Sequence, residues 1–442
     1  MRLTLPIFDF TDNNGFNSGI DIFGRKRFGE QVTNLILNTE ENLVLALDSN
    51  WGQGKSTFIR MWKDHNNLLE VPLTTIYFDA FENDYQQDAF LALASEVYNA
   101  LQLDVETDKE EFKNKVFNVA KAFGRSAIRI GSRVATAGLI DDTILDAAQD
   151  ELSKSISDNV ESYISHKLDN TDQDRLALKE FRDFLSTVIQ EKMANKKLVF
   201  VIDELDRCRP DFALEIIEKI KHLFSVEGLT FLLVMNRTQL EESVKCKYGS
   251  GIEAQTYLQK FIHIWLQLPE NRNQDFGQSD KIKFLNYAVR EMDCDFLAVN
   301  DVTKKTLLEV IAANNTSFRE IERMMTQIAI IQNIETHTSQ YNFNYQLAVA
   351  GLIFIKVNLP DLYLGLVTKK IDPDMLLRRL NIKQENGTYA GSLANIILAT
   401  LCDDATFEQM LESGQIQMET HRAFDRDVFV SLHNVVNNFG QI

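Results

Sequence analysis

Short, continuous runs of apolar residues recur along the first 270 residues, and each ends at a polar residue or a turn. Such runs are typical of strands buried on both faces of a parallel sheet, where no solvent-facing side requires polar residues. The five runs that we predict as strands are residues 43–48, 72–78, 197–203, 229–235 and 261–268.

Between these strands, apolar residues recur every three or four positions, which predicts amphipathic helices. Residues 102–196 contain no strand pattern, and after residue 270 the pattern is helical. Helices are predicted over residues 25–38, about 55–65, 86–101, 278–292, 302–313, 317–334 and 342–356. We divide the chain into the first part of an α/β core (1–101), a helical insertion (102–196), the second part of the core (197–270), a helical lid (271–334) and a C-terminal helical domain (335–442).

Residues 43–57, LVLALDSNWGQGKST, join the first strand to a helix through a glycine-bearing turn. In such a loop, backbone N–H groups and the helix N-terminus surround a phosphate chain, and the Lys55 ammonium adds a full positive charge. Ser49 stands where the pattern G-x-x-x-x-G-K-[ST] has its first glycine. We favour phosphate binding over an ordinary turn. The predicted nucleotide-binding residues are Asn50, Trp51, Gly52, Gln53, Gly54, Lys55, Ser56 and Thr57, and Ser56 is also a predicted Mg²⁺ ligand.

Carboxylates follow the second and third predicted strands. Asp79 and Glu82 follow the second, and Asp203 and Glu204 follow the third. In open α/β sheets, ligands bind where parallel strands end. An apolar strand followed by Asp203 and Glu204, well downstream of a phosphate loop, predicts that Asp203 holds Mg²⁺ and that Glu204 polarises the attacking water. A helix-capping acid is the alternative.

Two further positions have alternative interpretations. Asn236 follows the fourth strand, where an asparagine can sense the γ-phosphate or cap the next helix; we favour the sensor because this edge faces the phosphate loop. Gly24 and Arg25 enter the helix over 25–38. A Gly-Arg pair at this point often lies over the base and ribose in nucleotide-binding ATPases, but a solvated basic cluster is an equal alternative.

The net charge of −18 disfavours a global electrostatic interaction with nucleic acid. Residues 112–140 are a local exception, with six basic residues and no acids. Lys121, Arg125, Arg129 and Arg133 are four apart and share one helical face. We favour a helical hairpin, whose basic face pairs with the acidic residues 141–158, over nucleic-acid or membrane binding.

The location of the protein is indicated by its cysteines and its apolar runs. The four cysteines lie far apart and form no C-x-x-C pair, which argues against structural zinc and a disulfide framework and fits a reducing cytoplasm. The N-terminus reaches Asp9 too early for a signal-peptide core. The most apolar run, 347–355, is about half as long as a membrane helix. We therefore expect a cytoplasmic chain without a transmembrane span.

Together these landmarks resemble the KAP-family P-loop NTPases over about residues 20–330. The matching pieces are GRKRFGEQV, NWGQGKST, FDAFEND, IDELDRCRP, YLQKFIHIWLQLP at 257–269 and FREIER at 318–323. The family usually has Gly at position 49, Asn at 79, often Asp at 204 and commonly Asp at 236. Glutamate is the commoner hydrolytic residue among P-loop ATPases, so Glu204 favours activity.

The resemblance implies an ATPase that uses ATP and Mg²⁺. We predict a three-layer α/β P-loop domain whose five parallel strands are in the order 5-1-4-3-2. The resemblance also implies that Arg319 is a lid arginine and that Arg207 is a second arginine for transition-state charge. Many members carry transmembrane helices between the phosphate loop and the strand that ends at Asp203. Here the basic segment 112–140, with glycines at positions 124, 131 and 138, looks like a soluble replacement. The resemblance further implies a homo-oligomeric, nucleotide-driven switch that controls a separate effector protein in antiphage defence. The alternatives are a nucleic-acid-stimulated sensor or translocase and an ATP-binding regulator with little turnover.

Overall fold

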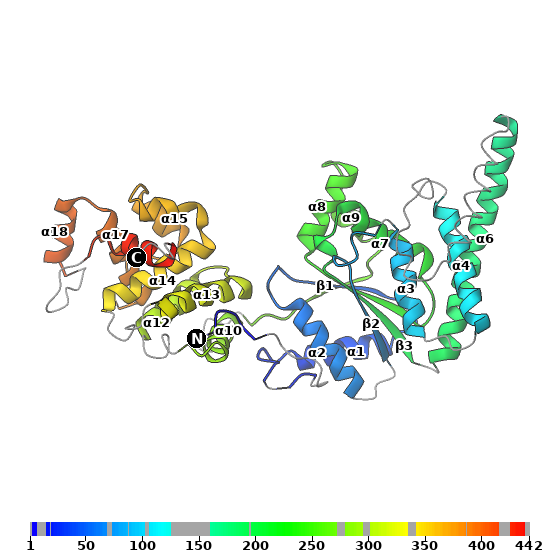
Figure 1. Ribbon diagram of the computed structural model, residues 1–442, viewed down its shortest axis with the longest axis horizontal. Coiled ribbons are helices and arrows are strands. Elements are labelled where there is room, and N and C mark those ends of the chain that lie inside the picture. The colour runs from blue at the N-terminus through cyan, green and yellow to red at the C-terminus, as the bar shows by residue number, and fades with distance from the viewer. Residues whose placement is uncertain are drawn as a thin grey trace.

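The computed structural model describes residues 2–6, 15–17, 19–68, 73–86, 88–101, 106–124, 160–193, 196–271, 279–294, 301–334, 342–385, 387–414 and 425–437. They form an α/β lobe and a helical lobe, which lie side by side in Figure 1. The chain begins beside the helical lobe, where the Arg2 backbone N–H donates to the Met292 carbonyl at 2.8 Å.

A five-stranded, all-parallel sheet forms the centre of the α/β lobe. Its strands are β1 (Val44–Asp48), β2 (Leu73–Asp79), β3 (Lys197–Asp203), β4 (Leu229–Met235) and β5 (Ile264–Gln267). Their order is β2-β3-β4-β1-β5, which confirms the predicted order. The fifth strand is shorter than expected, because the N–H groups of Phe261 and Ile262 both donate to the Leu258 carbonyl and continue the turn of the preceding helix.

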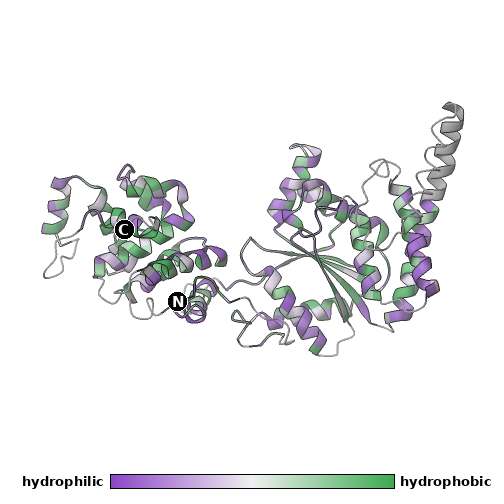
Figure 2. Cartoon of the chain, viewed as in Figure 1, coloured by the Kyte–Doolittle hydropathy of each residue, from purple (hydrophilic) through white to green (hydrophobic). Residues whose placement is uncertain are grey.

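Helices cover both faces of the sheet, so the predicted three-layer arrangement is confirmed. Alternate residues of one strand point to opposite faces. Leu45 and Leu47 pack with α1 (Lys26–Leu37) and α2 (Lys55–Leu68) on one face. On the other face, Ala46 belongs to the core formed with α3 (Ala89–Leu101), α7 (Pro210–Leu223), α8 (Arg237–Tyr248) and α9 (Ala254–Leu258). Figure 2 shows apolar residues concentrated in the central strands.

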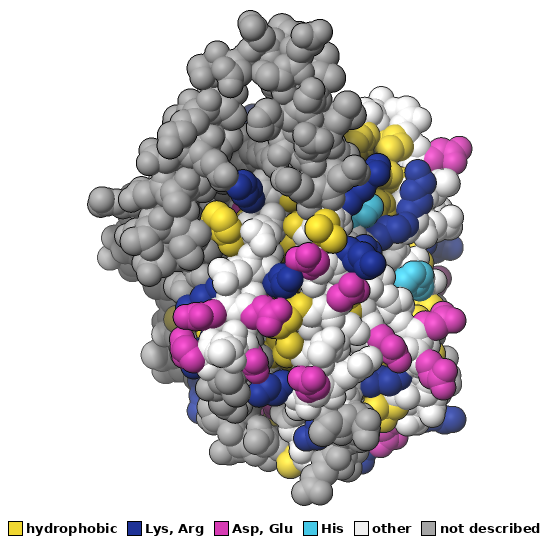
Figure 3. All heavy atoms as spheres, turned by 90° about the vertical axis from the view of Figure 1, so that its right-hand side faces the viewer, with side chains coloured by type: hydrophobic (Ala, Val, Ile, Leu, Met, Phe, Trp, Pro, Cys, Tyr) yellow, Lys and Arg dark blue, Asp and Glu magenta, His cyan; other side chains and the backbone are white. Residues whose placement is uncertain are grey.

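Within residues 102–196, α4 (Glu106–Gly124) and α6 (Val160–Met193) pack against each other and against the α/β core. Phe112 and Phe181 are fully buried, and Phe181 also meets Phe90 of α3 edge to face. Acidic and basic side chains are interspersed on the described part of the face shown in Figure 3.

Only part of the predicted basic stripe lies within the described residues. Lys121 lies in α4, but Arg125, Arg129 and Arg133 fall outside the described residues, as does the acidic stretch expected to pair with them. Among the helices that the structure describes, none combines the length and apolar character needed to cross a membrane.

Residues from both the expected lid and the expected C-terminal domain contribute to the main hydrophobic core of the helical lobe. Its central helix is α14 (Phe343–Asn358), which is buried over most of its length because its residues are apolar on all sides. The other helices are α10 (Asp280–Glu291), α12 (Asp301–Ala313), α13 (Phe318–Ile334), α15 (Pro360–Val367), α16 (Pro373–Arg379), α17 (Tyr389–Leu401), α18 (Asp404–Glu412) and α19 (Val428–Asn437).

Candidate functional site

The phosphate loop joins β1 to α2 at the carboxyl edge of the sheet. Gly52 and Gly54 have φ angles of 74° and 77°, in the left-handed region where a side chain would be strained. Ser49 has a negative φ, so its position does not require glycine, and the departure from the family pattern carries no backbone strain.

Lys55 is the first residue of α2, and its ammonium lies against the loop. Its Nζ donates to the carbonyl oxygens of Ser49 and Asn50 at 2.6 and 3.1 Å. Burial lowers the pKa of Lys55, an effect opposed by nearby carboxylates, of which Asp206 and Asp203 contribute most. These carboxylates therefore favour the charged form of the ammonium.

Asp203 ends β3 and is completely buried. Its carboxylate accepts hydrogen bonds from the Tyr77 hydroxyl at 2.9 Å and the Glu204 backbone N–H at 2.8 Å, and the nearby Ser56 hydroxyl also lowers its pKa. Burial raises the pKa of Asp203, whereas these hydrogen bonds lower it. The hydroxyl of Ser56 and the carboxylate of Asp203 thus meet as two oxygen donors, the chemistry that Mg²⁺ prefers.

No group of three or more His, Cys, Asp or Glu side chains in the described residues could hold a metal ion. Mg²⁺ is usually bound through one or two protein oxygens and completed by nucleotide phosphates and water. The pair of Ser56 and Asp203 fits a magnesium ion held in this way.

Glu204 adopts a left-handed backbone conformation, with φ 59° and ψ 26°. Such a conformation in a residue other than glycine persists only where its surroundings hold it. Its carboxylate lies 3.4 Å from Ser56 Oγ and 2.6 Å from the Nε of Arg207, which belongs to the short 3₁₀ helix η1 (Leu205–Arg207). Burial raises the pKa of Glu204; the adjacent Asp203 raises it further and Arg207 opposes the shift.

Sequence reasoning missed two contacts that connect the loops of this edge. The Trp51 indole N–H donates to the carboxylate of Asp206, in η1. Arg209 binds Asp84 through its backbone N–H and its Nε, both at 3.0 Å. These residues lie within the matched pieces NWGQGKST, IDELDRCRP and FDAFEND. The pattern of residue types gave no indication of which of them would pair.

Arg25 lies beneath the phosphate loop. Its side chain is buried, and it donates from Nη1 to the Gln53 carbonyl at 3.1 Å and from Nε to the Pro269 carbonyl at 3.2 Å. Burial lowers its pKa to about 10, although Asp280 and Asp21 oppose the shift. The solvated basic cluster is therefore wrong for Arg25, whose guanidinium supports the loop from below.

Asn236 caps α8. Its side-chain oxygen accepts from the Gln239 backbone N–H at 3.4 Å, which is the capping alternative considered from the sequence. A sensor role for the same side chain stays a prediction. Glu82 lies near Asp79, to which its backbone N–H donates at 3.0 Å.

The start of α13 contacts the phosphate loop. A methyl group added to Gly52 would lie 2.9 Å from the Cβ of Arg319, so the two segments touch. Ser317 caps the helix, accepting from the Glu320 N–H at 3.3 Å, while Glu320 accepts from the Ser317 N–H at 2.6 Å. Phe318 stacks on Phe23, with ring centroids 4.6 Å apart. The structure thus brings Arg319 to the same edge as Lys55, Ser56, Asp203 and Glu204.

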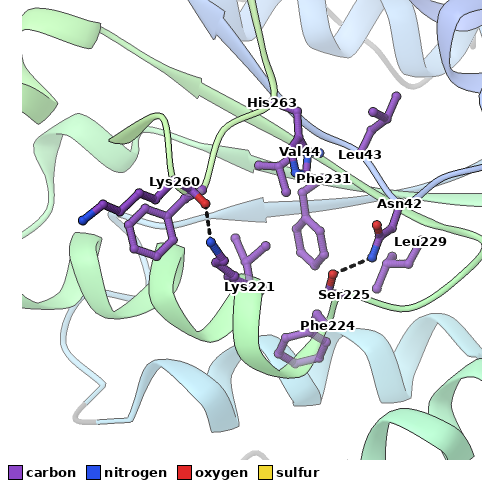
Figure 4. Close-up of a pocket in the computed structure, with 12 residues that line it drawn as sticks. Asn42, Leu43, Val44, Lys221, Phe224, Ser225, Leu229, Phe231, Lys260 and His263 are labelled. Atoms are coloured by element: carbon purple, nitrogen blue, oxygen red, sulfur yellow. Dashed lines mark hydrogen bonds between the residues drawn. The ribbon is translucent and has the colours of Figure 1, made fainter. Parts of the chain in front are cut away.

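A cavity of about 90 Å³ lies at the opposite edge of the sheet, where β1, β4 and β5 begin. Figure 4 shows Lys221 directed toward the Lys260 carbonyl and Asn42 toward Ser225, each with a hydrogen bond of 2.5 Å. Because the phosphate loop is at the carboxyl edge, this cavity is separate from the candidate site.

Comparison with known proteins identifies one matching family. The model of the KAP family P-loop domain matches residues 25–334. Comparison with curated proteins finds no match. Among solved structures, the ORC2 protein of Aeropyrum pernix, in ADPNP-ADP complexes, matches with a TM-score of 0.36 and 10% identity, over 94% of each chain. Similarity at that level supports no argument about function.

Proposed function

The chain belongs to the KAP family of P-loop NTPases, and from that premise we propose that it binds ATP with Mg²⁺ and hydrolyses it. One observation carries this proposal. The Ser56 hydroxyl of the phosphate loop donates to the carboxylate of Glu204 at 3.4 Å and lies close enough to Asp203 to lower the pKa of that acid. The loop, the metal-binding acid and the water-orienting acid therefore meet at one point.

Each residue contributes to a different part of the reaction. The loop 50–57 holds the phosphates through its backbone N–H groups, and the Lys55 ammonium neutralises their charge. Ser56 and Asp203 hold Mg²⁺, which screens the phosphate charge when bound. Glu204 orients the attacking water, Asn236 contacts the γ-phosphate, and Arg319 and Arg207 stabilise the transition state. Gly24 and Arg25 complete the nucleotide site, with Arg25 supporting the loop carbonyl of Gln53.

Glu204→Gln tests the assignment of the hydrolytic residue. This change keeps the shape of the side chain but removes the carboxylate, so we expect turnover to fall by at least about a hundredfold while ATP binding is retained. Glu227→Gln, an exposed glutamate beyond the other edge of the sheet, is the matched control and should leave turnover unchanged. Intact turnover in Glu204→Gln would show that another group orients the water.

We further propose that ATP binding and hydrolysis drive a change of conformation or assembly that controls a separate effector in antiphage defence, in the cytoplasm. The contact between α13 and the phosphate loop supports this, because a nucleotide at the loop would act directly on the helical lobe. Particle size should be measured with and without a slowly hydrolysed ATP analogue. An unchanged monomer in both samples would contradict nucleotide-driven assembly.

A nucleic-acid-stimulated ATPase is the second candidate, supported by Lys121, Arg125, Arg129 and Arg133. The net charge of −18 opposes it. ATPase rates measured with DNA and RNA across a salt series would distinguish the two. Stimulation that disappears when Arg125, Arg129 and Arg133 are changed to Glu would favour this candidate. A single-turnover assay would distinguish both from a regulator that binds ATP with little hydrolysis.

A further inference from the structure

Trp51 stands immediately before the first glycine of the phosphate loop, yet its side chain does not belong to the core. The indole is 43% exposed, and its N–H donates to the carboxylate of Asp206. An indole N–H is a donor only, and a hydrogen bond to an ionised carboxylate is among the stronger types. Asp206 is buried, at 8% exposure, so loss of this donor would leave a desolvated carboxylate with one fewer partner.

Asp206 belongs to η1, the single turn that directly follows Glu204. The left-handed conformation of Glu204 depends on what holds the residues on either side of it. Before it, Asp203 Oδ1 accepts from the Glu204 N–H at 2.8 Å. After it, Leu205 is fully buried, the Arg207 N–H donates to the Glu204 carbonyl at 3.1 Å, and Asp206 is held by Trp51. Trp51 is thus a contact through which the phosphate loop restrains the turn after Glu204, in addition to the contact of Ser56 with the Glu204 carboxylate.

The pair joins segments 155 residues apart in the sequence. One partner is in the loop expected to close on phosphate, and the other is two residues from the carboxylate expected to orient water. A displacement of the loop at Trp51 would be transmitted to η1 and so to the direction of the Glu204 side chain. Reaction rates are sensitive to such shifts, since a misplacement of about 1 Å can cost roughly a hundredfold.

We propose that Trp51 and Asp206 are a positioning pair, which couples phosphate binding at the loop to the placement of Glu204. This inference rests on the proposed ATPase function and adds to it a pair of side chains whose role is to position Glu204, whereas the backbone of Trp51 belongs to the loop that holds the phosphates. It also gives Trp51 a role other than covering the nucleotide.

Kinetics of Trp51→Phe, Asp206→Ala and the double variant test the pair. Trp51→Phe keeps an aromatic ring at an exposed position and removes the N–H together with the second ring of the indole, so the fold should be retained. We expect kcat to fall about ten- to hundredfold in each single variant, with KM for ATP changed less than about twofold. Because both changes break one contact, the double variant should be no slower than the slower single variant.

Two control variants accompany these measurements. Trp265→Phe changes a tryptophan of β5 whose ring lies under Arg237, and Asp211→Asn changes an exposed acid in the first turn of α7. Both should retain wild-type kcat. Three results would each refute the proposed positioning role of Trp51 and Asp206. They are an unchanged kcat in Trp51→Phe, a raised KM with unchanged kcat, and multiplicative effects in the double variant.

Tryptophan emission distinguishes failure of this inference from failure of the ATPase proposal. The chain has three tryptophans, and Trp62 is fully buried, so in a Trp265→Phe background Trp51 is the exposed reporter. We expect Mg²⁺-ATP to change its emission, and Asp206→Ala to abolish that change. If the Trp265→Phe protein shows this emission change without hydrolysing ATP, the proposed hydrolysis is contradicted and the proposed coupling between loop and turn is retained. If the same protein hydrolyses ATP but shows no emission change, only the proposed coupling between loop and turn is refuted.

Discussion

Gly52→Ala perturbs the contact between the phosphate loop and the helical lobe at a single atom. The added methyl group would lie 2.9 Å from Arg319 Cβ and 3.3 Å from the Arg319 backbone nitrogen. Carbon atoms that are not bonded do not approach so closely, and one of the two neighbours is backbone, so a side-chain rotation cannot relieve the overlap. The first turn of α13 must therefore move away from the loop.

The expected magnitude has two parts. At φ 74°, alanine is strained by about 1–2 kcal/mol relative to glycine. Displacing α13 adds the cost of an overpacked contact, about 1–3 kcal/mol. The free energy of unfolding should thus fall by roughly 2–5 kcal/mol. Denaturant unfolding measures the total, and hydrogen exchange in the first turn of α13 locates the second part.

Two other glycines provide matched controls, because they have similar backbone angles and different neighbours. Gly24 has φ 69° and nothing within 4 Å of an added Cβ, and Gly54 has φ 77° and only Arg25 Nη1 at 3.4 Å. Alanine at either position should show the backbone cost alone, with normal exchange in α13. Equal losses in all three variants, or unchanged exchange in Gly52→Ala, would refute the proposed contact.

Three further predictions concern neighbouring features. Arg25→Lys should lower the free energy of unfolding, measured by denaturation, by about 1–3 kcal/mol, because lysine cannot reach both the Gln53 and Pro269 carbonyls. The control Arg27→Lys, at an exposed position, should change it by less than about 0.5 kcal/mol in the same assay. Ser317→Ala should cost about 1 kcal/mol by removing the cap of α13, measured in the same way. Burial raises the pKa of Cys208 to about 12, so its thiolate fraction at pH 8 is about one in ten thousand. A thiol reagent should therefore label the exposed Cys246 first and Cys208 far more slowly, which mass spectrometry would measure.

The sheet could be predicted because its strands are buried on both faces and are therefore continuous apolar runs. The predicted order of the strands is confirmed by the pairing of β1 with both β4 and β5. Strand ends also placed Asp203 beside Asp79, its register partner, at the edge where the phosphate loop lies. The positions of the strand ends in the sequence were thus sufficient to predict the location of residues that the backbone of the sheet places.

Side-chain partners could not be predicted in the same way. Arginine is usually exposed, and the buried Arg25 finds its partners 28 and 244 residues away, at carbonyl groups that any sequence would provide. Asn236 occupies a position where a helix cap and a phosphate sensor require the same residue type. Choices of this kind depend on packing between distant segments, which leaves no periodic pattern in the sequence.

The two arginines predicted to serve the reaction both lie near the phosphate loop or Glu204 of their own chain. The Nε of Arg207 lies 2.6 Å from a carboxylate oxygen of Glu204, and Arg319 lies beside Gly52. We therefore predict that each chain supplies its own arginines and that no second protomer is required for turnover. Mixing the inactive variants Glu204→Gln and Arg319→Ala tests this: the mixture should show only the mean of the two separate rates. Restored turnover would show that Arg319 acts across protomers. Without restoration, any assembly driven by ATP would be a consequence of the nucleotide state and not a requirement for turnover.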